Sequence, residues 1–333
     1  MTDRPIGRRP LAALAAAGLP LARPALAQRP AGLTIIVAFP PGGALDLLAR
    51  LLAERLAPVL GQPVSVENRA GNGGALGAEA VARAAPDGGT VGLLGLTTWT
   101  AMPAIFPRLP FDPARDFTPL SLVSAGALLC VVPAETAAAR GWGDFRALIT
   151  WARANPGKVT MGSSGKGTAS HLCLSAVNQA TGAAIGHLPY RGGGPAIQDL
   201  LAGHVDMMFD VMPALLPHVR EGRLTPLAVS SARSLPALPE VPGMAGFADL
   251  GLDRLDLVTW NALAAPAGLP APVADRLLQA IRLAATTPDF RARLRPLGYE
   301  AVVSESRGEL AQLIDQQRPV WQRLVTLAGA VQP

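Results

Sequence analysis

Two glycine-rich turns hold residue types suited to binding a small anion. The first turn, 38–46, has the sequence Ala-Phe-Pro-Pro-Gly-Gly-Ala-Leu-Asp, and the second, 162–171, has the sequence Gly-Ser-Ser-Gly-Lys-Gly-Thr-Ala-Ser-His. Each turn follows an apolar, strand-like run and opens a helical pattern. Backbone N–H groups at a helix N-terminus lack partners within the helix, and the helix dipole adds positive potential there. We therefore interpret the two turns as gripping one small anion from two sides.

The first turn supplies one apolar and several polar candidates. Gly42 and Gly43 would offer backbone N–H groups, and Phe39 is a candidate apolar wall. Asp46 is an awkward direct neighbour for an anion. It could instead orient the turn, hold a bridging water, or accept a hydrogen bond from a ligand amine or hydroxyl. The alternative is an ordinary strand-to-helix turn in which Asp46 favours the helix start.

The second turn is dense in hydroxyl groups. Ser163, Ser164 and Thr168 lie beside Gly167, and neutral donors of this kind suit carboxylate oxygens. The turn matches neither the Walker phosphate loop nor the Gly-x-Ser-x-Gly nucleophile elbow. His171 follows within one helical turn and could contact a ligand or only pack. A serine-rich capped turn is the alternative interpretation.

Further candidates follow other predicted strands. Thr97 and Thr98 come directly after the apolar run 90–96, and Asp210 follows the run 205–209. Ligands of parallel sheets bind beyond the carboxyl ends of the strands. Asp210 could therefore accept a hydrogen bond from a ligand amine or hydroxyl, or it could cap the helix that follows.

Enzymatic alternatives have few candidate residues. Ser163 or Ser164 with His171 is the one nucleophile–base set, so an exported α/β hydrolase is the main rival to a binding protein. A Rossmann dinucleotide binder is disfavoured because no Gly-x-Gly-x-x-Gly follows the first strand. The four histidines lack the spacing of a zincin site. We expect no catalytic residue, no metal and no cofactor.

The predicted elements indicate two α/β units. Strand and helix patterns alternate from residue 33 to 96 and again from about 128 to 234, which predicts parallel sheets flanked by helices. The later elements are expected to complete the first unit. We predict one lobe from 28–127 plus 235–333 and a second lobe from 128–234, because 333 residues suffice for two cores.

The N-terminus has the features of an export signal. A basic start containing Arg8 and Arg9, a short apolar core and an Ala-x-Ala site predict a signal peptide over residues 1–27, of the general secretory or twin-arginine type. This segment carries most of the formal net charge of +5, so we expect no nucleic-acid partner. Cys130 and Cys173 could pair after export or remain buried thiols.

The ordered motifs resemble the periplasmic receptors of tripartite tricarboxylate transporters, often called Bug receptors. The matching phrases are Phe39-Pro40-Pro41-Gly42-Gly43 with Asp46, Val66-Glu67-Asn68-Arg69 with Gly71, Gly73-Gly74 and Gly77, Pro86-Asp87-Gly88, the run from Gly162 to Leu172, Pro189-Tyr190-Arg191-Gly192, Pro195-Ala196, Asp199-Leu200-Leu201, Val205-Asp206 and Ala265-Pro266-Ala267-Gly268. Three positions depart from the pattern: Met102, Gly89 and Lys166, of which Lys166 would favour a second ligand carboxylate or point into solvent.

The resemblance implies a two-lobed α/β fold of the periplasmic-binding-protein (Venus flytrap) type with two crossover segments. It also implies that the two glycine loops hold a ligand carboxylate, largely through backbone N–H groups and ordered waters. Such a receptor would be a periplasmic monomer that closes around an organic, amino or aromatic acid. It would present the closed form to membrane transporter subunits or to a sensor.

Overall fold

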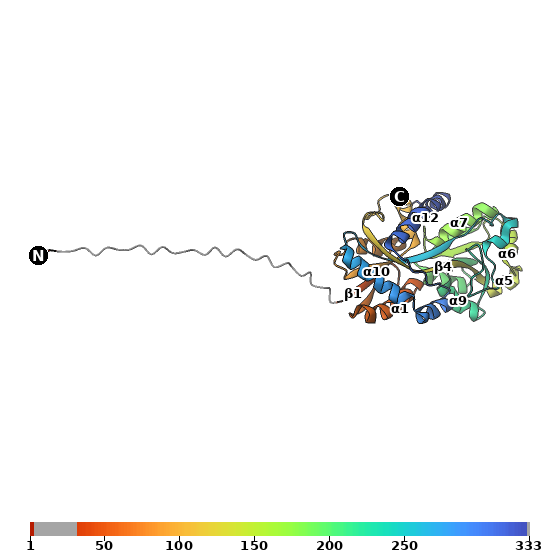
Figure 1. Ribbon diagram of the computed structural model, residues 1–333. Helices are drawn as coiled ribbons and strands as arrows, with labels where there is room; N and C mark the ends of the chain where they lie inside the picture. The colour runs from red at the N-terminus through yellow and green to blue at the C-terminus, as the bar shows by residue number, and fades with distance from the viewer. Residues whose placement is uncertain (3–31, 332–333) are drawn as a thin grey trace.

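The computed structural model describes residues 1–2 and 32–331, and it shows two halves joined by a long strand (Figure 1). The predicted signal peptide, residues 1–27, lies almost wholly outside the described residues. Among the residues that are described, no helix has the length and apolar character needed to cross a membrane.

The first half is built on a five-stranded sheet with one reversed strand. Its strands, in spatial order, are β2 (Val64–Asn68), β1 (Leu33–Val37), β3 (Thr90–Gly95), β9 (Val258–Pro266) and β4 (Phe117–Pro133). Strand β1 is parallel to β2 and β3, whereas β9 is antiparallel to both β3 and β4. The carboxyl ends of β1 and β3 therefore lie at the same edge, where the first glycine turn begins.

The second half repeats this plan. Its strands, in spatial order, are β8 (Leu224–Val229), β4, β7 (Met207–Val211), β5 (Thr160–Ser163) and β6 (Gly186–Pro189). Strand β5 is parallel to β6 and β7, and β4 is antiparallel to β7 and β8. The carboxyl ends of β5 and β7 thus meet at one edge, beside the second glycine turn.

Strand β4 connects the two sheets. Its residues up to Ala127 pair with β9, and from Leu128 onward it pairs with β7 and β8. The expected α/β fold with two lobes and mostly parallel sheets is confirmed. The exact boundaries between the lobes remain a prediction. The segment after β8 packs on the second sheet, since Val229 bridges to Gly243 and Phe247 packs against Phe145.

Helices cover both sheets. Those beside the first sheet are α1 (Ala44–Leu60), α2 (Ala75–Ala82), α3 (Leu96–Thr100), α4 (Met102–Ile105), α10 (Ala271–Ala285) and α11 (Pro288–Leu294). Helix α1 buries Leu48, Leu52 and Leu56 at a spacing of four residues and ends at Gly61, whose φ of 64° suits glycine. Helix α4 begins the proline-rich stretch from 102 to 119.

The helices of the second half follow the same logic. They are α5 (Ala134–Arg140), α6 (Phe145–Ala154), α7 (Ala169–Thr181), α8 (Gly193–Leu201) and α9 (Met212–Arg220). Helix α6 starts at Phe145 because the Asp144 side chain caps it by accepting from the Ala147 amide at 2.8 Å. Short 3₁₀ turns occur at η1 (Asn72–Gly74), η2 (Met244–Leu250) and η3 (Arg295–Leu297).

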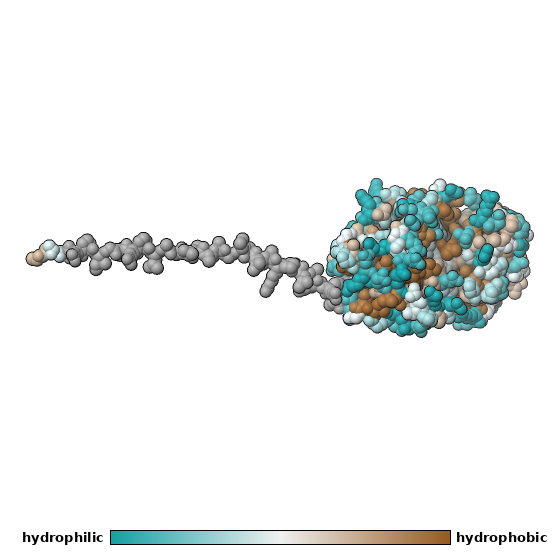
Figure 2. Space-filling view, in the orientation of Figure 1, coloured by the Kyte–Doolittle hydropathy of each residue, from teal (hydrophilic) through white to brown (hydrophobic). Residues whose placement is uncertain are grey.

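The C-terminal helix α12 (Arg307–Leu327) packs against α3 of the first half and α7 of the second (Figure 1). Ser306, which stands three residues before Glu309 in a capping-box spacing, caps it, with its hydroxyl accepting from the Glu309 amide at 3.2 Å. The helix therefore braces the two halves on one side. Figure 2 shows a band of hydrophobic residues through the middle of the visible face, between the two halves.

Cys130 and Cys173 are buried free thiols, so the structure shows no disulfide between them. Burial raises the pKa of both thiols well above the usual range, which leaves them protonated and unreactive.

Candidate functional site

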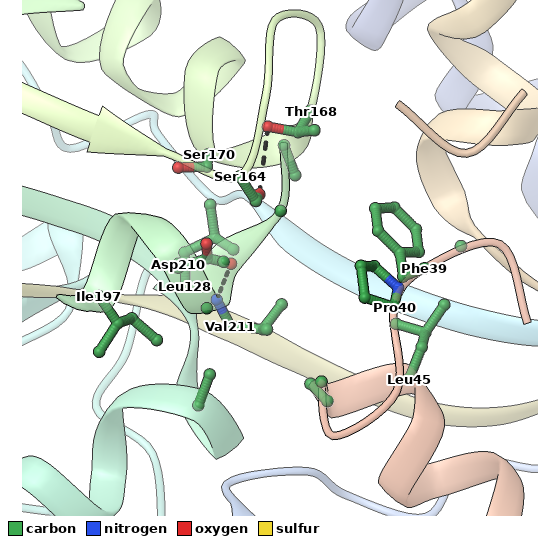
Figure 3. A pocket seen from close by; sticks show the side chains of 18 of the residues that line it. Phe39, Pro40, Leu45, Leu128, Ser164, Thr168, Ser170, Ile197, Asp210 and Val211 are labelled. Carbon is green, nitrogen blue, oxygen red and sulfur yellow. Dashed lines mark hydrogen bonds between the residues drawn. The ribbon is translucent and has the colours of Figure 1, made fainter. Parts of the chain in front are cut away.

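A cavity of about 560 Å³ lies between the two halves and is lined by both glycine turns. Its lining includes seven of the residues that the sequence singled out: Phe39, Gly42, Gly43, Thr97, Ser164, Thr168 and Asp210. In Figure 3, Phe39 and Pro40 of the first turn face Ser164 and Thr168 of the second across the cavity. Two segments about 120 residues apart in the sequence thus converge on one space.

Asp46 lies behind the first turn and holds it in place. Its Oδ2 accepts hydrogen bonds from the Gly42 amide and from Arg50 Nε, both at 2.9 Å, and its Oδ1 accepts from the Asn68 side chain at 2.9 Å. The same Asn68 amide donates to the Phe39 carbonyl. Burial raises the pKa of Asp46, but these donors outweigh burial and hold it below its usual value. Asp46 therefore orients the turn, which is one of the roles expected for it.

The second turn is closed by its own hydroxyl groups. Thr168 Oγ1 donates to the Gly165 carbonyl at 2.8 Å, and the Ser164 hydroxyl lies 3.4 Å from Thr168 Oγ1. Both side chains line the cavity (Figure 3). The hydroxyl-bearing residues of this turn that line the cavity are therefore Ser164, Thr168 and Ser170, of which Ser170 donates its hydroxyl to the Phe209 carbonyl.

Ser163, Gly167 and His171 of the second turn do not line the cavity. The Gly167 amide donates to His171 Nδ1 at 3.1 Å, and the His171 ring stacks on the His187 ring with centroids 3.9 Å apart. Ser163 Oγ lies 2.6 Å from His187 Nε2. Burial, aided by the nearby Lys166 charge, lowers the pKa of both histidines to about 4. This neutral pair supports the turn from behind.

A third glycine turn completes the cavity. Residues 192–194 line it, and Gly192 lies against the Pro40 ring of the first turn. The phrase around Gly192 entered the predictions only as part of the family resemblance. Its run of three glycines is the signal that could have identified this turn. The missed lining residues also include Asn261, Gln198 and His218, whose polar groups alone did not distinguish them from surface residues.

Thr97 and Thr98 lie in the first turn of α3 rather than in a loop. Thr97 lines the cavity, whereas Thr98 is buried against the interior. Trp260 is both almost fully buried and part of the lining. Its Nε1 donates to Gln317 at 2.9 Å, which fixes the ring beneath the cavity.

The N-termini of four helices of nine or more residues converge on this cavity, where the five-residue α3 also begins. The N-terminal residues of α1, α7, α8 and α9 all contribute to the lining, and none of these helices has a side-chain cap. Their first-turn N–H groups and dipoles place positive potential in the cavity. Among the described residues, the lining contains no lysine or arginine. The attraction for an anion therefore comes from the backbone.

Asp210 is the one acidic residue of the lining. It lies at the end of β7 and is only 5% exposed. Its Oδ1 accepts from the Val211 amide at 2.7 Å (Figure 3). Its buried Oδ2 has no hydrogen-bond partner, and a Cβ added at Gly193 would lie 3.4 Å from it. Burial raises the pKa of Asp210 to about 6, although the Val211 amide and the nearby Ser164 hydroxyl oppose the shift.

Hydrolase chemistry finds no support in this geometry. Ser163 is fully buried and pairs with His187, not with the expected His171. Ser164, which does line the cavity, has Thr168 rather than a histidine as its partner. Within the described part of the chain, no group of three or more histidine, cysteine or acidic side chains could hold a metal ion.

Comparison with known proteins gives a consistent result. A model described as the tripartite tricarboxylate transporter family receptor matches residues 48–329. The chain is 35% identical to the protein BugT of Bordetella pertussis over 300 residues, which covers 89% of each chain. A Pseudomonas protein from the tcbD–tcbE intergenic region is 37% identical over 293 residues, covering 88% of this chain and 85% of that protein.

Solved structures extend the match to ligand complexes. Rpa4515 of R. palustris, determined with adipate, superposes with a TM-score of 0.83 at 28% identity and covers 90% of this chain and 97% of its own. MatC from Rhodopseudomonas palustris, with bound malate, gives a TM-score of 0.80 at 32% identity and covers 88% and 98%.

Proposed function

Because the chain belongs to the tripartite tricarboxylate transporter receptor family, we propose that it binds a small carboxylate in the cavity between its two lobes. Receptors of this family bind solutes for transport. The ligand of this chain would be an organic, amino or aromatic acid with an apolar body, since most of the cavity lining is apolar. We also propose that it works in the periplasm and delivers its ligand to membrane transporter subunits or a sensor.

The convergence of four uncapped helix N-termini on one cavity carries this proposal. A carboxylate there would accept hydrogen bonds from first-turn N–H groups of α1 in one lobe and of α7 and α8 in the other. The adipate and malate complexes of the two Rhodopseudomonas relatives support a carboxylate ligand. A ligand that contacts both lobes would favour their closed arrangement.

The lobes of this chain already contact each other beside the cavity. Gly192 lies against Pro40, and Gly167 lies so close to Ile105 that an added Cβ would be 2.5 Å from its Cδ1. These contacts join the glycine turns of one lobe to residues of the other. Closure around a ligand would use the same contacts, with β4 and the segment between η2 and β9 as the crossover segments.

The experiment is a thermal-shift screen of residues 28–333 with adipate, malate, glutamate and benzoate. Thr97→Val in one lobe and Ser164→Ala in the other each remove a hydroxyl from the lining, and Thr225→Val on β8 removes one away from it. We expect a saturable rise in Tm with at least one acid, weakened by both lining variants and unchanged in the control. A rise in Tm that neither lining variant weakens would contradict the assignment of this cavity.

A further inference from the structure

Asp210 indicates a further way in which this cavity recognises its ligand, beyond the helix N-termini. A carboxyl group in the lining of an anion site is a conflict, because an ionised aspartate would repel a carboxylate ligand. Asp210 cannot turn away, since its Oδ1 is held by the Val211 amide and the side chain is buried. Its Oδ2 faces the third glycine turn and has no partner within the protein.

We propose that Asp210 is a specificity residue whose protonation is linked to ligand binding. Asp210 is protonated when the ligand is bound, and its Oδ2–H donates a hydrogen bond to a ligand carboxylate oxygen. This proposal rests on the proposed function and names how the same site selects its ligand. The proton comes from solvent, and no covalent bond forms or breaks. A protonated carboxyl group is a donor and can pair with a carboxylate, whereas an ionised one accepts only.

The surroundings of Asp210 favour the protonated form. No lysine or arginine lines the cavity among the described residues, so no cationic side chain pairs with an ionised Asp210, and burial outweighs the Val211 amide and the Ser164 hydroxyl that favour its charged form. Burial raises its pKa to about 6 before any ligand arrives, and an adjacent ligand carboxylate would raise it further. Binding would then take up a proton at neutral pH.

The other titratable groups on the elements around Asp210 do not all face the cavity. Tyr299 is buried outside the lining of this cavity, and its pKa is raised mainly by burial and also by the Asp210 charge. His218 of α9 lines the cavity, and burial together with the Arg223 charge lowers its pKa. His171 of α7 lies behind the second turn. Cys130 of β4 is a buried protonated thiol. Only His218 could add a second proton to the bound state.

A ligand ammonium group is the competing occupant of this position. An ammonium would pair with an ionised Asp210, but it would sit beside the positive ends of α8 and α9, whose N-terminal residues line the same wall. A carboxylate beside a protonated Asp210 is attracted by those ends instead. The helix N-termini therefore favour the acid–carboxylate pair.

The test is calorimetric titration of residues 28–333 with adipate, malate and benzoate between pH 5 and 8.5, in buffers of different ionisation enthalpy. We expect Kd to rise about tenfold per pH unit above pH 7 and about one proton to be taken up per ligand. Asp210→Asn presents a neutral donor, so its Kd should be independent of pH and about 100-fold lower than that of the wild type at pH 8. His218→Gln is the matched control and should keep the wild-type slope.

A flat wild-type profile with clear binding would overturn the proton linkage and leave the proposed function intact. The same holds for an affinity that rises with pH above pH 7 and for a slope that His218→Gln abolishes. Failure of every acid in the panel to bind at any pH would overturn both proposals.

Discussion

Asp46 Oδ2 accepts a hydrogen bond from the Gly42 amide at 2.9 Å, so the acid of the first glycine turn points at its own backbone. The anionic side chain is thereby kept out of a cavity built to attract anions. It also withdraws the Gly42 amide from the set of donors available to a ligand. The donors that the first turn can offer are those of the following residues, at the start of α1.

Asp46→Ala should lower both stability and ligand affinity. The substitution leaves the Gly42 and Asn68 amides without their acceptor, which we expect to reduce the free energy of unfolding by about 1–3 kcal/mol. Because hydrogen bonds hold the pKa of Asp46 below 3.8, its stabilisation is present above that pH and is lost as pH falls through the lowered pKa. Urea unfolding and ligand titration check these effects.

Asp87→Ala is the matched control for the first turn. Asp87 also accepts a hydrogen bond from a glycine amide, Gly89 at 2.8 Å, but it lies at an exposed turn outside the cavity. We expect a loss of at most about 1 kcal/mol and no change in Kd. Equal affinities for Asp46→Ala and the wild type would refute the orienting role of Asp46.

Alanine substitutions at Gly167 and Gly42 distinguish the effect of backbone strain from the effect of contact between the lobes. Both have φ near 80°, so alanine at either position should cost about 1–2 kcal/mol. An added Cβ meets nothing within 4 Å at Gly42, but lies 2.5 Å from Ile105 of the other lobe at Gly167. Gly167→Ala should therefore weaken ligand binding more than Gly42→Ala.

The second substitution Ile105→Ala should restore affinity to Gly167→Ala by removing the atom that the new Cβ meets. Titration calorimetry of the single and double variants measures this coupling. Additive losses in the double variant would show that the two residues do not meet during closure.

Asp210 should make stability depend on pH in the direction opposite to that of a paired carboxylate. Its pKa is raised from 3.8 to about 6 in the fold, so its contribution is full below 3.8 and is lost as pH rises through 6. The loss should be about 3 kcal/mol, from two pKa units. Thermal unfolding of the wild type and Asp210→Asn between pH 4 and 8 measures it, and parallel curves for the two proteins would contradict the raised pKa.

Ser163 and Ser164 should differ in what their hydroxyl groups do. Ser163→Ala removes the buried partner of His187 and should lower the free energy of unfolding by about 1–3 kcal/mol without changing the lining of the cavity. Ser164→Ala should mainly raise Kd. We expect neither the wild type nor the two variants to hydrolyse p-nitrophenyl esters. Esterase activity of the wild type that either substitution abolishes would revive the hydrolase alternative.

The sequence predicted the alternation of strands and helices because apolar periodicity and glycine turns are local signals. The amphipathic pattern from Ala271 to Ala285 coincides with α10, and the Ser-x-x-Glu spacing at Ser306 coincides with the cap of α12. The sequence did not predict α3 and α4, since these short helices follow β3 in a proline-rich stretch without a periodic face. Their helical form depends on packing against α12.

The cavity was partly predictable for a related reason. Glycine, hydroxyl and acidic residues at strand ends pointed to Gly43, Ser164 and Asp210, which all line the cavity. Sequence could not show which side chains face inward, so Ser163 and His171 were chosen although the structure places them behind the turn. Whether the twelve chosen residues contact the ligand remains a prediction, because it depends on distances across the two lobes.

The most direct test of the account is a calorimetric comparison of a carboxylate with its neutral amide. Residues 28–333 would be titrated with adipate and adipamide, and with benzoate and benzamide, after unfolding and refolding to remove retained ligand. If helix N-termini of both lobes bind the negative charge, at least one acid should bind saturably and its amide should bind at least about 100-fold more weakly. Equal affinity for acid and amide, or no binding by either acid, would contradict the central claim that this cavity is a carboxylate site.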